Sequence, residues 1–273
     1  MEERALSSFE NEKYRISVYY DEFADSPNGF YDMVGVMLFT YDNGKLHKEC
    51  DWRTLLGEHG DYNITMKEAL KELVWKYVPH DKVIKFLKKG TEHYQLMWNK
   101  SKRRWQFWYD KKVFGRNPCV LFSSDSEDMH CGYLDSEMLS CLDKSDIVEL
   151  INRYGNDIVV TSLTTYGDYQ GKIQEMFAYC TKKRFNKMAG TPKNNWKKKA
   201  TEFMQNELKE CGCWMWGHVY RVKVEEKVYF TKRYANGKEL EDFEYEGYEC
   251  GQVFYCDDWD EALECVKEDY IKE

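Results

Sequence analysis

The stretch EKVYFTKRYANGKELEDFEYEGY, residues 226–248, predicts a long β-hairpin. Its centre, Asn236-Gly237, favours a tight hairpin turn because both residues tolerate positive φ. Upstream, from Trp214 onward, aromatic and β-branched side chains recur at every second residue, which is the period of a strand. We therefore expect one strand from Trp214 to the turn and a second strand after it.

Strands and a helix are predicted on both sides of this hairpin. Residues 256–270 (CDDWDEALECVKEDY) predict a closing helix, with acidic residues in its first turn. Residues 14–22 (YRISVYYDE) and 30–41 (FYDMVGVMLFTY) are rich in the β-branched and aromatic residues of strands. The Ser-Pro-Asn-Gly turn between them predicts an N-terminal antiparallel hairpin. Asn43-Gly44 predicts a further turn.

The central segments have the apolar period of amphipathic helices. They are residues 63–78, 80–90, 144–155, 169–185 and 194–210. We expect Ser145 to cap the third of them and Gly155 to end it. The sequence therefore predicts an α+β protein, with an N-terminal antiparallel hairpin, central helices and a C-terminal β-hairpin plus helix. We place a division between residues 1–125 and residues 126–273, with a single domain as the alternative.

The composition indicates a folded chain. Hydrophobic residues make up 42% of the 273, and the net charge of -8 opposes nonspecific binding to nucleic acid. No apolar run approaches the ~20 residues of a membrane span, and the first residues lack the features of a signal peptide. We therefore expect a cytoplasmic protein whose ten cysteines are reduced. No P-loop, G-x-S-x-G or Gly-rich dinucleotide motif occurs, so no cofactor is expected.

Asp21, Glu22 and Asp25 are acidic residues that could hold metal ions in a nuclease. Asp21 and Glu22 are neighbours on a predicted strand, so their side chains should point to opposite faces. Asp25 fits a turn position, where its side chain can bond a backbone N–H. We therefore expect no catalytic residue and no enzyme, and a metal-dependent nuclease stays as an alternative.

Four cysteines are the candidates for a structural zinc site. Cys211 and Cys213 would share one face if they lay on a strand, and Cys250 and Cys256 could meet them if the terminal strands pair. The tight C-x2-C spacing usual for zinc is absent, and buried reduced cysteines explain the pattern as well. We expect no metal.

Residues 98–116 (WNKSKRRWQFWYDKKVFGR) interleave Lys and Arg with Trp, Phe and Tyr. Such a surface can bind single-stranded nucleic acid, because the cations contact phosphates and the rings stack on bases. The other interpretation is a strand that buries its aromatic residues and leaves its basic ones in water. The candidate nucleic-acid contacts are Lys102, Arg103, Arg104, Trp105 and Trp108.

The second half of the predicted C-terminal hairpin is acidic. Carboxylates beside aromatic residues can occupy a basic groove on a partner and imitate the phosphates of nucleic acid. Ordinary solvated surface is the alternative. The candidate partner-binding residues are Glu239, Glu241, Asp242, Phe243, Glu244, Tyr245 and Glu246.

Residues 19–37, YYDEFADSPNGFYDMVGVM, resemble the opening motif of a group of accessory proteins carried by phages and plasmids. The matching positions are Asp21, Glu22, Ser26, Pro27, Gly35 and Met37. Residues 131–147 resemble a Trp-Asp-Ser-Gly-x-x-Gly block of that group, although Tyr133, Glu137 and Ser140 stand near its Trp and Gly positions. Residues 203–222 and 248–255 resemble its C-terminal strand pair and Cys-Gly-x-Phe-Tyr segment.

The resemblance implies a protein of a mobile element that blocks bacterial immunity by binding a defence complex. The phage anti-Gabija proteins are a similar case, and Gabija pairs a nuclease-ATPase with a helicase-like partner. We therefore expect a homo-oligomeric inhibitor in the host cytoplasm that covers the DNA-binding or active surface of such a complex. The alternative is an accessory protein that binds single-stranded nucleic acid.

Overall fold

The computed structural model describes residues 4–27, 32–40, 64–90, 94–109, 119–124, 139–140, 142–166, 173–190 and 194–271. Contacts divide the chain into two compact units, one of residues 1–32 and 209–273 and one of residues 33–208. The first unit therefore joins the two ends of the chain. This division differs from the boundary at residue 125 expected from the sequence, because an N-terminal strand pairs with a C-terminal one.

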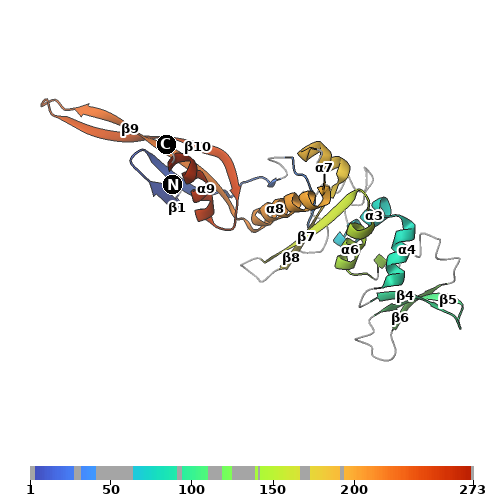
Figure 1. Ribbon diagram of the computed structural model, residues 1–273. Coiled ribbons are helices and arrows are strands. Elements are labelled where there is room, and N and C mark those ends of the chain that lie inside the picture. Colours follow the sequence, from blue (N-terminus) through green and yellow to red (C-terminus); the bar gives the residue numbers. More distant parts are fainter. Residues whose placement is uncertain are drawn as a thin grey trace. The chain divides into compact units, whose positions relative to one another are not determined.

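The first unit is built on a four-stranded antiparallel sheet with the order β1-β2-β9-β10 (Figure 1). Its strands are β1 (Ser7–Glu10), β2 (Tyr14–Tyr20), β9 (Val219–Arg233) and β10 (Glu239–Tyr255). β1 and β2 form an N-terminal hairpin, and β9 and β10 form the C-terminal hairpin predicted around Asn236-Gly237. Helix α9 (Trp259–Ile271) follows, with Asp260 and Glu261 in its first turn as expected.

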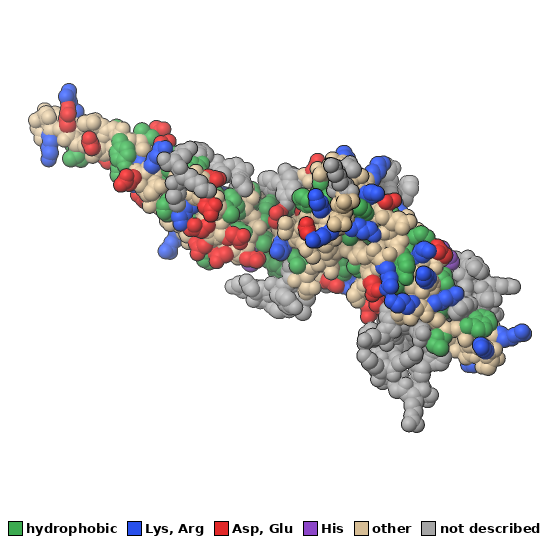
Figure 2. Space-filling model, in the orientation of Figure 1, with side chains coloured by type: hydrophobic (Ala, Val, Ile, Leu, Met, Phe, Trp, Pro, Cys, Tyr) green, Lys and Arg blue, Asp and Glu red, His purple; other side chains and the backbone are tan. Residues whose placement is uncertain are grey.

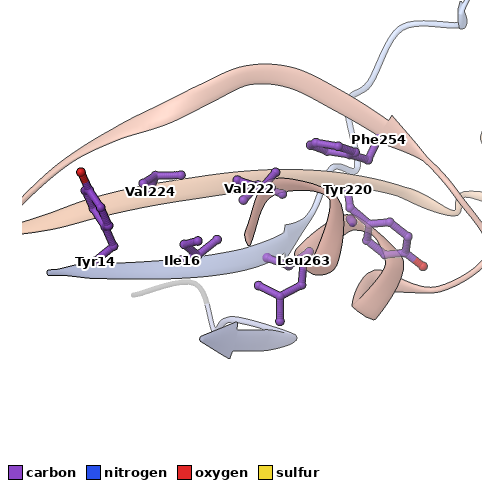
Figure 3. Close-up of a cluster of buried hydrophobic side chains, with 10 residues drawn as sticks. Tyr14, Ile16, Tyr220, Val222, Val224, Phe254 and Leu263 are labelled. Carbon is purple, nitrogen blue, oxygen red and sulfur yellow. The ribbon is translucent and has the colours of Figure 1, made fainter. Parts of the chain in front are cut away.

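Helix α9 packs against this sheet and closes the core of the first unit (Figure 3). Ile16 and Val18 of β2 and Val222 of β9 are completely buried there. Tyr14, Tyr220, Val224, Phe254, Ala262, Leu263 and Val266 complete the cluster. Each buried aliphatic side chain stabilises the fold by about 1.5–3 kcal/mol, so this cluster holds the N-terminal and C-terminal segments together.

Helix α8 (Trp196–Trp216) is longer than the sequence pattern predicts. The strand expected from Trp214 begins only at Val219, so the period-two assignment of Trp214 and Trp216 is wrong. Gly217 ends the helix with φ 77°. Its N–H donates to the carbonyl of Trp214 at 3.0 Å, and the N–H of His218 donates to that of Cys213 at 2.8 Å. This is a Schellman motif, which marks the true end of the helix.

In the described residues of the second unit there are two three-stranded antiparallel sheets, with the orders β3-β8-β7 and β4-β5-β6. The strands are β3 (Val36–Leu38), β4 (Tyr94–Asn99), β5 (Arg104–Tyr109), β6 (Cys119–Ser124), β7 (Ile158–Tyr166) and β8 (Ile173–Thr181). The helices are α3 (Met66–Tyr77), α4 (His80–Lys89), α6 (Lys144–Tyr154), α7 (Lys182–Ala189) and most of α8. The predicted apolar face of α3 is buried, namely Met66, Leu70, Leu73 and Val74.

The helix expected over residues 169–185 is wrong, because Ile173–Thr181 forms strand β8 and only then does α7 begin. β8 lies between β3 and β7, and its residues 176–180 are all buried. A strand covered on both faces shows no alternation of polar and apolar residues. Its sequence therefore fits a buried strand and a helix equally well.

Helix α6 ends at Gly155 as predicted, but it differs from its prediction at the N-terminal end. Its N-cap is Asp143 and not Ser145. Gly155 has φ -74°, so it does not supply the positive φ expected after a helix. It supplies space instead, since a Cβ at this position would lie 2.5 Å from Ile158 Cγ2 and 2.6 Å from the carbonyl oxygen of Ile151.

The two strands expected to pair across the Ser-Pro-Asn-Gly turn belong to different sheets. β2 pairs with β1 and β9, whereas β3 pairs with β8. The α+β class is confirmed, with an N-terminal hairpin made by β1 and β2. The turn predicted at Asn43-Gly44 lies outside the described residues. Among the residues described, no helix has the length and apolar character needed to span a membrane.

Candidate interaction surface on the β9–β10 hairpin

The distal part of the β9–β10 hairpin extends past the other strands of its sheet (Figure 1). β2 accompanies β9 only as far as the pair Tyr14 and Glu226. Beyond this pair, residues 227–233 and 239–245 pair with each other, and the described part of the chain adds no third strand. We call residues 227–245 the arm.

The arm ends in a three-residue loop, residues 235–237, and not in the two-residue turn that Asn-Gly often makes. The N–H of Tyr234 donates to the carbonyl of Lys238 at 2.9 Å, and the N–H of Gly237 donates to that of Tyr234 at 2.9 Å. Gly237 has φ 81°, the left-handed conformation that closes loops of this length. The resulting register places Phe243 opposite Tyr229.

The pleat of the two strands gives the arm two faces. One, which we call the aromatic face, carries Lys227, Tyr229, Thr231, Arg233, Glu239, Glu241, Phe243 and Tyr245. The opposite face carries Val228, Phe230, Lys232, Leu240, Asp242 and Glu244. A two-stranded ribbon cannot bury its own apolar side chains, so both faces leave some of them in water.

Three rings form a row on the aromatic face. The ring centres of Tyr229 and Phe243 lie 5.9 Å apart, and those of Phe243 and Tyr245 lie 5.5 Å apart in an edge-to-face arrangement. The hydroxyl of Tyr229 also donates to the carbonyl of Glu12 at 3.0 Å. Tyr229 is nevertheless 63% exposed and Phe243 41% exposed. Exposed rings in fixed positions are typical of protein contact sites, because they bury a large area at little cost in conformational entropy.

A buried carboxylate holds the sheet at the root of the arm. Glu225 accepts hydrogen bonds from Arg15 Nε at 2.6 Å and from Lys223 Nζ at 2.8 Å. Gly247 lies opposite Glu225 in β10, and a Cβ there would be 2.4 Å from Glu225 Cγ. Only glycine leaves room for this carboxylate and its two cations.

The same network reaches the first ring of the aromatic face. The guanidinium of Arg15 lies 3.8 Å from the ring centre of Tyr245, and the hydroxyl of Tyr245 donates to Glu10 at 2.8 Å. Lys227 pairs with Glu10 at 2.8 Å and lies 5.3 Å from the ring centre of Phe243. Cation–π contacts and ion pairs therefore fix the position of the arm's base relative to β1 and β2.

We expect the stability of the first unit to fall at acidic pH through Glu225. Burial alone would raise the pKa of Glu225, but the hydrogen bonds from Lys223 and Arg15 hold it below the ordinary value of 4.5. Because the pKa is lowered by folding, this stabilisation is present above pH 4.5 and is lost as the pH falls through the folded-state pKa. Glu225→Gln should lower stability at pH 7 by about 2 kcal/mol and flatten this part of the pH dependence. Urea unfolding of the wild type and of Glu225→Gln between pH 3 and pH 7 measures this pH dependence. Equal pH profiles for the two proteins would contradict the role of Glu225.

The acidic residues predicted to bind a partner do not form one strip. Glu239 and Glu241 lie on the aromatic face, whereas Asp242 and Glu244 lie on the opposite one. Arg233 Nε donates to Glu239 at 2.7 Å, and Lys232 forms an ion pair with Asp242. Figure 2 shows acidic and basic side chains intermixed along the arm. The arm is therefore a mixed-charge surface with exposed rings, and a continuous imitation of nucleic-acid phosphates is not supported by this arrangement.

Glu241, Glu244 and Glu246 differ from these paired acids. All three are exposed, and the described residues place no cation within ion-pair distance of them. Their charges remain available to a partner, since exposed unpaired charges act over several ångströms in water.

The residues predicted to contact nucleic acid lie at the turn from β4 to β5. Lys102 and Arg103 are exposed in this turn, and Arg103 has φ 50°. Asn99 Oδ1 accepts hydrogen bonds from the N–H groups of Ser101 and Lys102, both at 3.1 Å. Arg104, Trp105 and Trp108 belong to β5, and their side chains lie outside the described part of the structure.

Asp21, Glu22 and Asp25 lie in a loop, because β2 already ends at Tyr20. The argument that adjacent strand residues point to opposite faces is therefore wrong for Asp21 and Glu22. Asp21 Oδ1 accepts the N–H of Phe23 at 3.3 Å, which is the turn-stabilising role predicted for Asp25. Within the described residues, no group of three His, Cys, Asp or Glu is arranged to hold a metal ion.

The four candidate zinc ligands do not share a strand face. Cys211 and Cys213 are buried on helix α8 and not on a strand, where they would have shared one face. Burial raises the pKa of Cys213 to about 12 and that of Cys256 to about 11, which favours the protonated thiols. The side chain of Cys250 lies outside the described part.

A buried glutamate in the second unit holds the segment that carries Gly35, and the sequence patterns do not predict it. Glu207 of α8 accepts the N–H of Val34 at 2.6 Å and that of Gly35 at 2.8 Å. Arg184 of α7 donates to the carbonyls of Met33 at 2.7 Å and Val34 at 2.9 Å. A Cβ on Gly35 would lie 2.8 Å from Met204 Cγ, so glycine is required by packing. An acid within an amphipathic helix gives no local sign of such a role.

Comparison with protein-family models, with curated proteins and with solved structures finds no match to this chain.

Proposed function

We propose that this chain is a non-enzymatic binding protein that inhibits a bacterial antiviral complex of the nuclease and helicase type, such as Gabija. The observation that carries the proposal is the arm, which leaves Val228, Tyr229, Tyr234, Leu240 and Phe243 between 38% and 63% exposed. Apolar and aromatic side chains gathered on one projecting element favour a protein contact. The resemblance of residues 19–37 to phage accessory proteins supports the choice of target.

In this proposal the aromatic face packs against the target as a buried anchor. Its rings are already ordered by their contacts with Lys227 and Glu12, so little conformational entropy is lost on binding. The inhibitor acts by covering a surface that must engage DNA, and it works as a homo-oligomer in the host cell. No chemical step by the chain is part of this mechanism.

The proposal is tested with the full chain and a purified Gabija complex. DNA cleavage and complex formation are measured over increasing amounts of the chain, the latter by size-exclusion chromatography with light scattering. We expect cleavage to fall in parallel with the appearance of a stable complex of fixed stoichiometry. Full DNA cleavage by the Gabija complex at a saturating concentration of the chain would contradict inhibition. Retention of the chain on single-stranded DNA at physiological salt would favour the nucleic-acid alternative.

Charge reversal of the unpaired acids should slow association. Glu241→Lys with Glu244→Lys removes charges that would steer the arm toward a basic surface, and rim charges act mainly on the association rate. We expect an association rate about tenfold lower at low salt, a smaller salt dependence and an unchanged dissociation rate. The matched control is Glu268→Lys with Asp269→Lys on α9, which changes the net charge equally at exposed positions. Equal association rates for the two double variants would show that the arm's acids do not steer binding.

A further inference from the structure

Phe23 is the most exposed large apolar side chain in the described part of the chain, at 92%. It lies in the loop directly after β2, between Glu22 and Ala24. A phenylalanine in this state forgoes nearly all the stabilisation that its burial would bring. Among the described residues of the first unit, no contact therefore accounts for its side chain.

The backbone on both sides of Phe23 is held in place. The N–H of Asp21 donates to the carbonyl of Val219 at 3.0 Å. Trp214 Nε1 donates to the carbonyl of Ala24 at 3.2 Å, and the Tyr255 hydroxyl donates to that of Asp25 at 2.9 Å. Side chains of α8 and β10 thus fix the two residues after Phe23. A ring presented from a fixed loop is preorganised for binding, which reduces the entropy lost in a complex.

The charged residues next to Phe23 in the sequence are all negative. Asp21, Glu22 and Asp25 lie within two positions of Phe23, and the described residues place no cation within ion-pair distance of them. Such an arrangement repels phosphates, so it disfavours nucleic acid and anionic lipid. It complements an apolar pocket bordered by Lys and Arg on a protein.

We propose that Phe23 is a second anchor, which inserts into an apolar pocket of a partner protein bordered by basic side chains. The inference rests on the proposed function in that the chain acts by binding a protein, but it uses neither the arm nor its residues. Glu22 and Asp25 contact the basic border, and Trp214 and Tyr255 hold the loop in the binding geometry.

The experiment replaces Phe23 by the photo-reactive p-benzoylphenylalanine in the full chain, in bacteria that carry the Gabija operon. Irradiation links this side chain to whatever covers it, and mass spectrometry maps the linked residue on the partner. We expect one dominant adduct in an apolar pocket flanked by Lys or Arg. Glu22→Lys with Asp25→Lys should lower its yield about tenfold, while Glu268→Lys with Asp269→Lys should not. The same probe at Phe203, an exposed position of α8, gives the background.

Three results would overturn the inference, namely a yield no higher than at Phe203, an adduct site without basic neighbours, or a yield that does not respond to charge reversal. Because position 23 is exposed, the probe should leave the thermal unfolding transition unchanged, which circular dichroism checks.

Repeating the experiment with Tyr229→Ser and Phe243→Ser separates the two proposals. An aromatic-face variant that inhibits like the wild type contradicts the role of that face in the proposed function, whereas a missing Phe23 adduct contradicts this inference alone.

Discussion

Glu207→Ala is expected to destabilise the second unit by about 3–5 kcal/mol, the range for removing one partner from a buried charged site. The carboxylate accepts the N–H groups of Val34 and Gly35, and the residue is 7% exposed. Its loss leaves two buried donors without acceptors, at about 1–3 kcal/mol each. Because a domain is stabilised by only about 5–15 kcal/mol, much of the unit's stability would be lost.

Chemical unfolding followed by circular dichroism measures this effect. Glu202→Ala, an exposed change on the same helix, is the control and should shift stability by less than about 0.5 kcal/mol. Equal unfolding midpoints for the Glu207 and Glu202 variants would contradict the role of Glu207.

Glu207→Gln separates the charge of this side chain from its hydrogen bonds. Burial raises the pKa of Glu207, against the opposing effects of the two backbone N–H groups and Arg184. Folding therefore favours the protonated acid, and this contribution to wild-type stability decreases as the pH rises from the unfolded-state pKa through the folded-state pKa. The glutamine keeps one acceptor oxygen and cannot ionise. We expect it to be less destabilising than alanine and to lack this pH dependence.

Tyr229→Ser with Phe243→Ser should weaken binding to the target by about 100- to 1,000-fold. Anchoring aromatic residues contribute about 2 kcal/mol or more each, with contributions that do not simply add, and each 1.4 kcal/mol is a factor of about ten. The fold should survive, because both side chains are exposed, by 63% and 41%, and the core of the first unit lies elsewhere. The loss should appear mainly as faster dissociation. Surface plasmon resonance against the purified target measures both rates.

The opposite face of the arm provides the matched control. Val228→Ser with Leu240→Ser removes two side chains that are 38% and 45% exposed, on the same strands but the other face. This variant should bind like the wild type. If it loses binding while the aromatic-face variant does not, the contact uses the opposite face. If neither loses binding, the arm is ordinary surface.

Local chemistry in the sequence was sufficient to predict the features that depend on neighbouring residues. The turn around Asn236-Gly237, the apolar face of α3 and the acidic first turn of α9 depend on interactions within a few positions. The α+β class follows from the order of these elements. The Schellman end of α8 at Gly217 belongs to the same group, since a glycine after an amphipathic run is a local signal. Trp214 and Trp216 masked it, because aromatic residues two apart also fit a strand.

Only the tertiary structure decided which segments pair and which face each residue occupies. β8 is a strand because β3 and β7 bond to both of its edges, and burial on both faces removes the period that would have identified it. The three-residue loop, one residue longer than a two-residue turn, set Phe243 opposite Tyr229 instead of Phe230. The side chain of Glu207 accepts hydrogen bonds from Gly35 and Val34, which lie 172 and 173 positions away from it in the sequence. Such contacts depend on how distant segments pack, and local propensity carries no information about them.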